Sequence, residues 1–156
     1  ADAFLIFAPN ANSYRRFKAN SYAPVAPTWG VNNRTVSFRV TAGPPASRHV
    51  EHRIAGADAN PYLAMAAVLA GMCHGIENKL DPGPAVVGNG YEAQTDAPPM
   101  PGNWFAAVDR FAASDLMKQG LGERFVKMYR IVKQTEMERF FGTVPDLDYD
   151  WYLRTA

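Results

Sequence analysis

The sequence predicts an α+β fold in which a small antiparallel sheet is followed by helices. Two observations lead to this prediction. Short strand-like segments lie at residues 32–40 and 48–53, whereas the apolar residues after residue 60 recur at the spacing of helices. With 156 residues, an apolar fraction of 47% and a charged fraction of 20%, the chain suits one globular domain with a real core.

The first third of the chain alternates short predicted elements with loops. Residues 4–8 are apolar and are expected to form a buried strand. Residues 10–17 are polar and basic, and Asn10 or Asn12 fits the N-cap of one or two helical turns. Between the two charged strands, Gly43-Pro44-Pro45 is too rigid for a two-residue hairpin, so we expect a broad loop there.

The rest of the chain is predicted to be helical apart from one long loop. Asn60-Pro61 supplies an N-cap and a first-turn proline, and the helix that follows is expected to end after Leu80. Residues 82–102 are rich in Pro, Gly and Asn and predict an exposed loop. Three further helices are expected at residues 104–111, 121–141 and 146–153.

Composition excludes several classes of protein. The formal net charge of +1 argues against a nucleic-acid partner, because such binders carry a strong basic excess. Cys73 is the single cysteine, so no internal disulfide is possible and a cytoplasmic location is expected. The most apolar stretch, residues 61–72, is too short to cross a bilayer, so no membrane partner is expected.

The charged strands carry the clearest chemistry, because they hold four arginines and a single carboxylate, Glu51. Side chains alternate along a strand, so His49, Glu51 and Arg53 should share one face while His52 points to the other. Glu51 is a natural ligand for Mg²⁺, and Arg53 beside it could hold a carboxylate or phosphate oxygen. From spacing alone, the alternative is a surface Glu51–Arg53 pair that contributes little.

The other arginines leave more than one interpretation open. Strict alternation places Arg34 and Arg39 on opposite faces, and they converge only if Arg34 lies in the turn before the strand or a bulge intervenes. Solvated or salt-bridged side chains remain the alternative for both, as they do for Arg15 and Arg16. A packed or capping role is expected for His52 and for His74, which lies beside Cys73 in a helix. Tyr91 is expected to be exposed in the long loop.

Several motifs, in one order and at one set of spacings over most of the chain, resemble the C-terminal catalytic portion of glutamine synthetase. These motifs are Asn12-Ser13-Tyr14-Arg15-Arg16-Phe17, Asn33-Arg34 with Arg39 five positions on, Val50-Glu51-His52-Arg53, Asn60-Pro61-Tyr62-Leu63, Gly75-Ile76-Glu77-Asn78-Lys79 and Asp81-Pro82-Gly83. The resemblance implies that residues 1–156 are the C-terminal part of the family's catalytic domain, whose barrel would contain the predicted antiparallel strands.

The resemblance also implies an activity and roles for individual residues. The family uses ATP and Mg²⁺ or Mn²⁺ to phosphorylate the γ-carboxylate of glutamate, and ammonia or another amine then displaces the phosphate. Arg16 corresponds to a residue that binds the glutamate carboxylate, and Glu51 to a ligand of the metal between the ATP phosphates. Arg34 and Arg39 correspond to arginines on the ATP phosphates and the transferring phosphoryl group. Arg53 corresponds to an arginine at the glutamate and γ-phosphate end, so Arg34 and Arg53 are the expected catalytic residues.

Two departures from the family pattern bear on the acceptor. Glutamine synthetases carry Glu-Ala-Pro where this chain has Tyr22-Ala-Pro, and a tyrosine cannot supply that negative charge at neutral pH. His49 stands where they usually have an arginine toward ATP. Both departures favour a γ-glutamyl-polyamine synthetase, resembling the γ-glutamylputrescine synthetases, over a glutamine synthetase. A non-catalytic binding domain of the same fold is a further alternative.

The resemblance implies that the chain is one piece of a larger protein. The family draws most of its metal-binding carboxylates from earlier strands, and its N-terminal domain completes the site of a neighbouring subunit in a ring-shaped homo-oligomer. Because Glu51 alone cannot hold the metals, we expect the isolated chain to be inactive.

Overall fold

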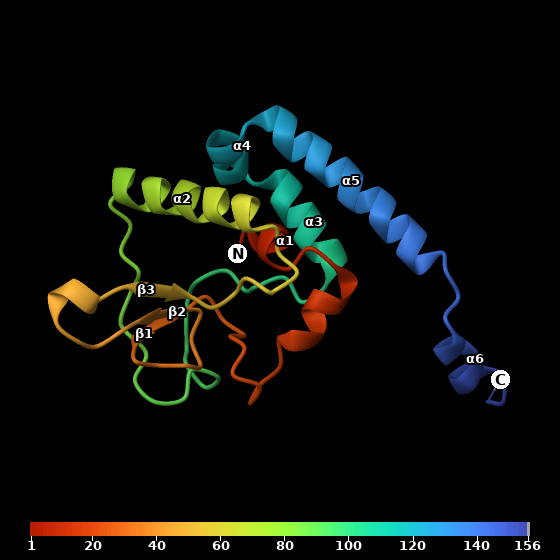
Figure 1. Ribbon diagram of the computed structural model, residues 1–156, viewed down its shortest axis with the longest axis horizontal. Coiled ribbons are helices and arrows are strands. Elements are labelled where there is room, and N and C mark those ends of the chain that lie inside the picture. The colour runs from red at the N-terminus through yellow and green to blue at the C-terminus, as the bar shows by residue number, and fades with distance from the viewer. Residues whose placement is uncertain (156) are drawn as a thin grey trace.

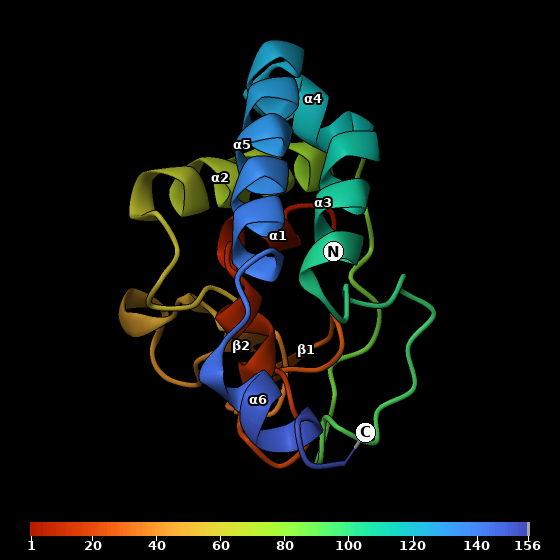
Figure 2. The same ribbon diagram turned by 90° about the vertical axis from the view of Figure 1, so that its right-hand side faces the viewer.

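The computed structural model describes residues 1–155, in which three short strands lie beside a layer of helices (Figure 1). The elements in chain order are α1 (Phe4–Phe7), η1 (Ala11–Arg16), β1 (Trp29–Val31), β2 (Phe38–Val40), η2 (Pro45–Ser47), β3 (Val50–His52), α2 (Pro61–Glu77), α3 (Trp104–Ala113), α4 (Asp115–Leu121), α5 (Glu123–Phe141) and α6 (Asp146–Tyr152). The strands lie together on one side of the yellow-green helix α2, and the C-terminal helix α6 lies beyond the end of α5 (Figures 1 and 2).

The prediction of a strand at residues 4–8 is wrong, because this segment forms the one-turn helix α1. The amide of Ala8 donates to the carbonyl oxygen of Phe4 over 2.8 Å, which is the hydrogen bond of a helical turn. All four residues of α1 are buried. A short segment that is apolar on every side has no periodicity, so the sequence alone does not separate a buried strand from a buried helical turn.

The α+β class is confirmed, but the sheet is mixed rather than antiparallel. Its strand order is β1-β2-β3, with β1 and β2 parallel and β2 and β3 antiparallel. Two features allow a parallel pair with so short a connection: each strand has only three residues, and Asn32 turns the chain at φ +50° directly after β1. The amide of Asn32 then donates to the carbonyl of Val40 over 2.9 Å. The strand predicted at residues 32–40 therefore begins too early, because its first residues form this turn.

The loop predicted between the charged strands is confirmed, and η2 lies within it. The helix predicted after Asn60 is confirmed as α2, and the Asn60 side chain accepts hydrogen bonds from the amides of Tyr62 and Leu63. α2 ends at Glu77 rather than at Leu80, with Asn78 as its C-cap. The helices predicted at residues 104–111, 121–141 and 146–153 correspond to α3, α5 and α6.

The helix α4 was missed, and its length explains why. It has seven residues, which are too few to establish a periodic pattern. Its local signals are a capping serine, Ser114, whose hydroxyl accepts from the amide of Met117 over 3.1 Å, and Gly122, which ends it at φ +90°. α4 packs against α2 and α5 and thereby joins the helices into one layer.

The core lies among the helices rather than on the sheet. Its completely or almost completely buried side chains include Leu5 in α1, Phe111 in α3 and Met117 in α4. The sheet contributes to the apolar interior with one face only, where the rings of Phe7 and Phe38 pack on His52 at centroid distances of 4.3 and 5.2 Å. Among residues 1–155, none of the helices combines the length and apolar character that crossing a bilayer requires.

Candidate active site

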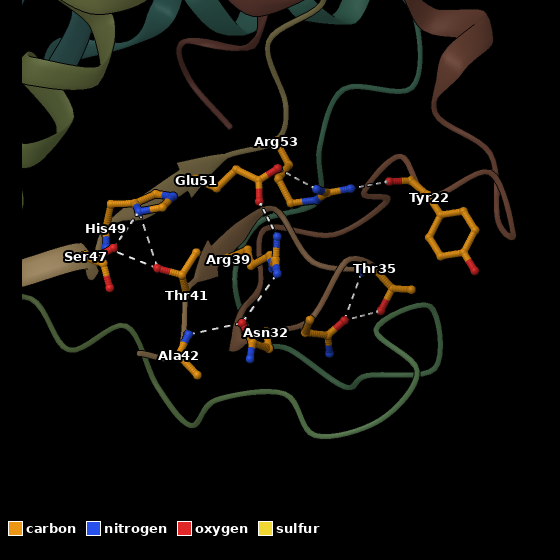
Figure 3. A network of polar contacts seen from close by, with 11 residues as sticks. Tyr22, Asn32, Thr35, Arg39, Thr41, Ala42, Ser47, His49, Glu51 and Arg53 are labelled. Carbon is orange, nitrogen blue, oxygen red and sulfur yellow. Dashed lines mark hydrogen bonds and ion pairs between the residues drawn. The ribbon is translucent and has the colours of Figure 1, made fainter. Parts of the chain in front are cut away.

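The charged face of the sheet is organised around Glu51. The strand register places Arg39 on β2 directly opposite Glu51 on β3. One carboxylate oxygen of Glu51 accepts from Arg39 Nη1 at 3.1 Å and the other from Arg53 Nη1 at 2.7 Å (Figure 3). Burial acts to raise the pKa of Glu51, but the hydrogen bonds and positive charges of the two arginines outweigh it and lower that pKa overall. Glu51 is therefore ionised at neutral pH.

Arg53 also connects the sheet to the segment that carries Tyr22. Its second terminal nitrogen donates to the backbone carbonyl of Tyr22 over 3.0 Å (Figure 3). Tyr22 lies in the left-handed region at φ +58°, which is uncommon for a bulky residue and is often seen where function requires a particular backbone direction. The Tyr22 side chain is 66% exposed and points away from Arg53 (Figure 3).

Arg16, at the end of η1, reaches the same place from the other side. Its guanidinium donates to the backbone carbonyls of Arg53 and Ile54 and lies 4.6 Å from the centre of the Phe17 ring. Partial burial is the main cause that lowers the pKa of Arg16, and the charge of Arg53 acts in the same direction. Arginine nevertheless stays protonated at neutral pH. Arg16 is therefore held as a cation beside the Glu51 cluster.

The 3₁₀ helix η1 owes its position to Asp58. The Asp58 carboxylate accepts a 2.5 Å hydrogen bond from the Ser13 hydroxyl and a 3.2 Å bond from the side-chain amide of Asn10. The amide of Asn10 donates in turn to the Ser13 hydroxyl over 3.0 Å. Burial acts to raise the pKa of Asp58, but these hydrogen bonds and the charge of Arg16 lower it overall. Asp58 thus anchors the helix that presents Arg16.

Arg16, Glu51 and Arg53 border one open cavity of about 340 Å³. A cavity that presents two guanidiniums beside a carboxylate suits ligands that carry phosphate or carboxylate groups. The Nε atoms of Arg39 and Arg53 are buried and have no hydrogen-bond partner among residues 1–155. The cavity is lined by Arg16, Ser21, Tyr22, Ala23, Glu51, His52, Arg53 and Ala55.

Arg34 lies apart from this cavity. It is in the turn before β2 and not on the strand, which is one of the two arrangements that the sequence left open. Its side chain is exposed and borders a second cavity of about 350 Å³ between the turn and the loop at residues 85–88. Of the five predicted site residues, Arg39 and Arg53 therefore contact Glu51, Arg16 borders the cavity beside Glu51, and Arg34 lines the second cavity.

The histidines behave differently from one another. The Nδ1 atom of His49, which was predicted to share the face of Glu51, lies 3.0 Å from the carbonyl oxygen of Ser47 and 3.4 Å from the Thr41 hydroxyl (Figure 3). His52 packs on the apolar face as predicted, and burial lowers its pKa to about 4. His74 lies near the end of α2, where its Nδ1 is 3.2 Å from the side-chain amide of Asn78.

A metal ion would find one carboxylate on this face of the chain. Among residues 1–155, no group of three His, Cys, Asp or Glu side chains is arranged to hold a metal. Glu51 has the oxygen chemistry that Mg²⁺ prefers, but both of its oxygens are engaged by arginines. The described residues can therefore contribute one ligand to a metal site and do not form such a site by themselves.

Sequence reasoning missed two asparagines that hold the site together. The Asn32 side chain accepts from Arg39 Nη2 at 3.4 Å and from the amide of Ala42 at 3.1 Å. Asn33 fastens the turn that carries Arg34 to the long loop. An Asn pair at the end of a strand is a turn signal, and that signal was available in the sequence. The prediction that Tyr91 is exposed is wrong, since it is partly buried with a buried hydroxyl.

Comparisons with known proteins identify the family. The family described as the catalytic domain of glutamine synthetase matches residues 1–152. The γ-glutamylputrescine synthetase PuuA of Escherichia coli is 42% identical over 151 residues, which are 97% of this chain and 32% of that protein. The γ-glutamylethanolamide synthetase GlnA4 of Streptomyces coelicolor is 39% identical over 152 residues, 97% of this chain and 31% of that protein.

A solved structure has the same fold. The complex of GmaS with ADP superposes with a TM-score of 0.81 at 29% identity, covering 97% of this chain and 36% of that one. The chain thus spans about a third of the length of the proteins that it matches. The matched domain covers all the residues of the Glu51 cluster, and the chain belongs to the glutamine synthetase family through its catalytic domain.

Proposed function

We propose that this chain is part of an ATP-dependent ligase that joins the γ-carboxylate of glutamate to an amine. The observation that carries the proposal is the cluster in which Arg39 and Arg53 flank Glu51 and Arg16 borders the same cavity. Transfer of a phosphoryl group depends on positioning and on neutralising charge, and fixed guanidiniums supply both. In this proposal, residues 1–156 are the C-terminal part of a longer catalytic domain.

The reaction has two steps. A γ-carboxylate oxygen of glutamate attacks the terminal phosphorus of ATP, forms γ-glutamyl phosphate and releases ADP. The nitrogen of a deprotonated amine then attacks the acyl carbon and inorganic phosphate leaves with the electrons of the broken C–O bond. In both steps negative charge moves between oxygens, and a guanidinium placed where that charge develops would stabilise the transition state more than the ground state.

We assign each charged residue one part of this reaction. Arg16 binds the carboxylate of glutamate. Arg34 and Arg39 bind the ATP phosphates, and Arg34 follows the phosphoryl group as it is transferred. Arg53 lies at the γ-carboxylate end, where its contact with the Tyr22 carbonyl fixes its direction. Arg34 and Arg53 are thus the proposed catalytic residues, and both also contribute to binding glutamate.

Glu51 is proposed as one ligand of a Mg²⁺ or Mn²⁺ ion that neutralises charge on the ATP phosphates. The remaining ligands would come from outside the described residues. Each Glu51 oxygen accepts one hydrogen bond from an arginine, so a lone pair remains on each oxygen that could coordinate the ion while the arginines stay in place. GmaS, which has the same fold, is solved as a complex with ADP, and this supports a nucleotide as ligand.

The acceptor is proposed to be an amine larger than ammonium, such as a polyamine of the putrescine type. Two observations support this. Tyr22, a residue without a carboxylate, borders the cavity at the position where a glutamine synthetase would have a carboxylate for ammonium. The two relatives described above are named for putrescine and ethanolamine products. Ammonia as acceptor, which would make the protein a glutamine synthetase, is the alternative.

A substrate panel on the full-length protein tests the proposal. With glutamate, ATP and Mg²⁺ present, putrescine, ethanolamine, isopropylamine and ammonium are supplied one at a time, and phosphate release and product mass are measured. We expect an alkylamine to give a higher kcat/KM than ammonium. A clear preference for ammonium refutes the proposal of a larger amine as acceptor. If no amine gives ATP turnover, the ligase proposal is refuted in favour of the non-catalytic binding domain.

The same experiment includes the isolated chain, which we expect to be inactive because it supplies one metal ligand. Amine-dependent phosphate release by residues 1–156 alone would contradict this. We further propose that the full-length protein works in the cytoplasm as a ring-shaped homo-oligomer. Its mass in solution, measured by light scattering, checks the oligomer.

A further inference from the structure

The turn that carries Arg34 is held by its neighbour Asn33. The Asn33 side-chain oxygen accepts from the amide of Thr35 at 2.9 Å and from the Thr35 hydroxyl at 2.6 Å. Its side-chain nitrogen donates to the carbonyls of Val86 and Gly88 at 3.2 and 2.9 Å. One amide group therefore satisfies two partners inside the turn and two on a loop more than fifty residues away in sequence.

The loop fits closely against both the turn and β1. The amide of Gly90 donates to the Thr35 hydroxyl over 2.7 Å, and the amide of Val86 donates to the carbonyl of Trp29 over 2.8 Å (Thr35 is labelled in Figure 3). A Cβ atom added at Gly30 would lie 2.7 Å from the carbonyl oxygen of Val86. One added at Gly90 would lie 2.7 Å from that of Thr35. Loop and turn are thus in backbone contact that only glycine permits at these two places.

Arg34 itself has no such support. Within residues 1–155, its side chain makes no hydrogen bond and no ion pair, in contrast to Arg39 and Arg53. Its direction is therefore set by the backbone of the turn. Asn33 precedes Arg34 and Thr35 follows it, and the side-chain hydrogen bonds between these two residues fix the backbone on both sides of Arg34.

We propose that Asn33 is a positioning residue for Arg34. By fastening the turn to the loop at residues 86–90, Asn33 holds the Arg34 guanidinium in the direction in which it meets the ATP phosphates. This inference rests on the proposed function and deepens it, because it assigns to a neutral residue the kind of support that Glu51 gives to Arg39 and Arg53. A misplacement of about 1 Å at a reacting group is enough to cost about a hundredfold in rate.

Asparagine is well suited to this role because it both donates and accepts. The substitution N33D would keep the two acceptor contacts with Thr35 but would place a carboxylate against the carbonyls of Val86 and Gly88. The substitution N33A would remove all four contacts. Comparing the two variants therefore separates the effect of losing the contacts with the loop from the effect of losing the contacts inside the turn.

The test uses the full-length protein with saturating glutamate and amine and varied ATP. We expect N33D and N33A each to lower kcat/KM for ATP about 10- to 100-fold, with the KM for the amine, measured separately at saturating ATP and glutamate, unchanged. The matched control is N89A. Asn89 lies in the same loop, but its side-chain hydrogen bonds go to Tyr91 and Glu92 and not to the turn of Arg34. N89A should leave all these constants unchanged.

A double-mutant cycle separates positioning from general loosening. If Asn33 acts through Arg34, N33D added to R34A should lower turnover no further, because the group that it positions is gone. A full additional loss in the R34A background overturns the inference, as does a kcat/KM for N33D equal to that of the unmodified protein. If N33A does not fold, the result for N33D decides the test. An R34A variant with full activity would instead refute the proposed role of Arg34 and with it that part of the proposed function.

Discussion

The charged face of the sheet and the helical core are held together in opposite ways. The core excludes water from large apolar side chains such as Phe111, Leu5 and Met117, each at most 1% exposed. The charged face is built on strands of three residues and depends on ion pairs and on hydrogen bonds from side chains to backbone. The Glu51 side chain at its centre is 37% exposed.

This difference separates stability from chemistry. Burial of apolar area contributes about 25 cal/mol for each Å² removed from water, whereas a partly exposed ion pair contributes about 0–1 kcal/mol. The positions whose loss unfolds the chain should therefore differ from those whose loss stops the reaction. Four changes test this separation.

The largest effect is expected from Phe111→Ala in α3. Removing a fully buried aromatic ring costs about 3–5 kcal/mol of unfolding free energy. Urea unfolding followed by circular dichroism measures it, with Phe105→Ala as the matched control because Phe105 lies on the same helix and is 53% exposed. Equal unfolding midpoints for the two variants would show that the helices do not form the stabilising core.

Arg53→Ala should have the second largest effect, and it should appear in turnover. Loss of a donor that meets developing charge lowers kcat of the full-length protein about 100- to 1000-fold, while the unfolding free energy changes by about 1 kcal/mol or less. Arg130→Ala, at an exposed arginine on α5, is the control and should alter neither quantity. A large loss of stability in Arg53→Ala would break the separation of the two regions.

Tyr22→Glu should change selectivity more than rate. A carboxylate at the rim of the cavity favours ammonium, so the ratio of kcat/KM for ammonium to that for putrescine should rise at least about tenfold. Tyr62→Glu, at an 84% exposed tyrosine on α2, is the matched control. An unchanged ratio in Tyr22→Glu would assign the choice of acceptor to residues outside this segment.

The smallest effect is expected at the anchor of η1. Asp58→Asn weakens the hydrogen bonds to Ser13 and Asn10 and should cost about 1 kcal/mol. The pKa of Asp58 is lowered from its ordinary value of 3.8, so the folded state holds the ionised form more firmly than the unfolded state does. That stabilisation is complete above about pH 4 and is lost as the pH falls through the lower folded value. The difference in Tm between the two proteins should therefore be smaller at about pH 2.5 than at pH 7 in melting curves.

Much of the helical region could be predicted from the sequence because it obeys local rules. Asn60 and Pro61 fix the start of α2, and apolar periodicity places α3 and α5. The strands were harder, since each is three residues long and its partners depend on distant backbone. The parallel pairing of β1 and β2 follows from Asn32 at positive φ, which no periodic pattern reveals.

The candidate site, too, has features that the sequence predicts and features that it does not. Alternation along β3 correctly placed Glu51 and Arg53 on one face and His52 on the other. It could not indicate that Arg39 faces Glu51 across the pair of strands, because this depends on their register. Nor could it indicate that Asn33 joins residues 86 and 88, because that contact is made by a loop without secondary structure.

The two edges of the sheet differ, and the difference limits how isolated chains can associate. The outer edge of β1 is covered where the amide of Val86 donates to Trp29, whereas no strand within residues 1–155 pairs with the outer edge of β3. An uncovered edge recruits further strands, and an assembly grows into a fibre only when both edges can do so. A chain with one covered edge should instead stop at an edge-to-edge pair. At high concentration the isolated chain is thus expected to form discrete dimers through β3, not open-ended aggregates.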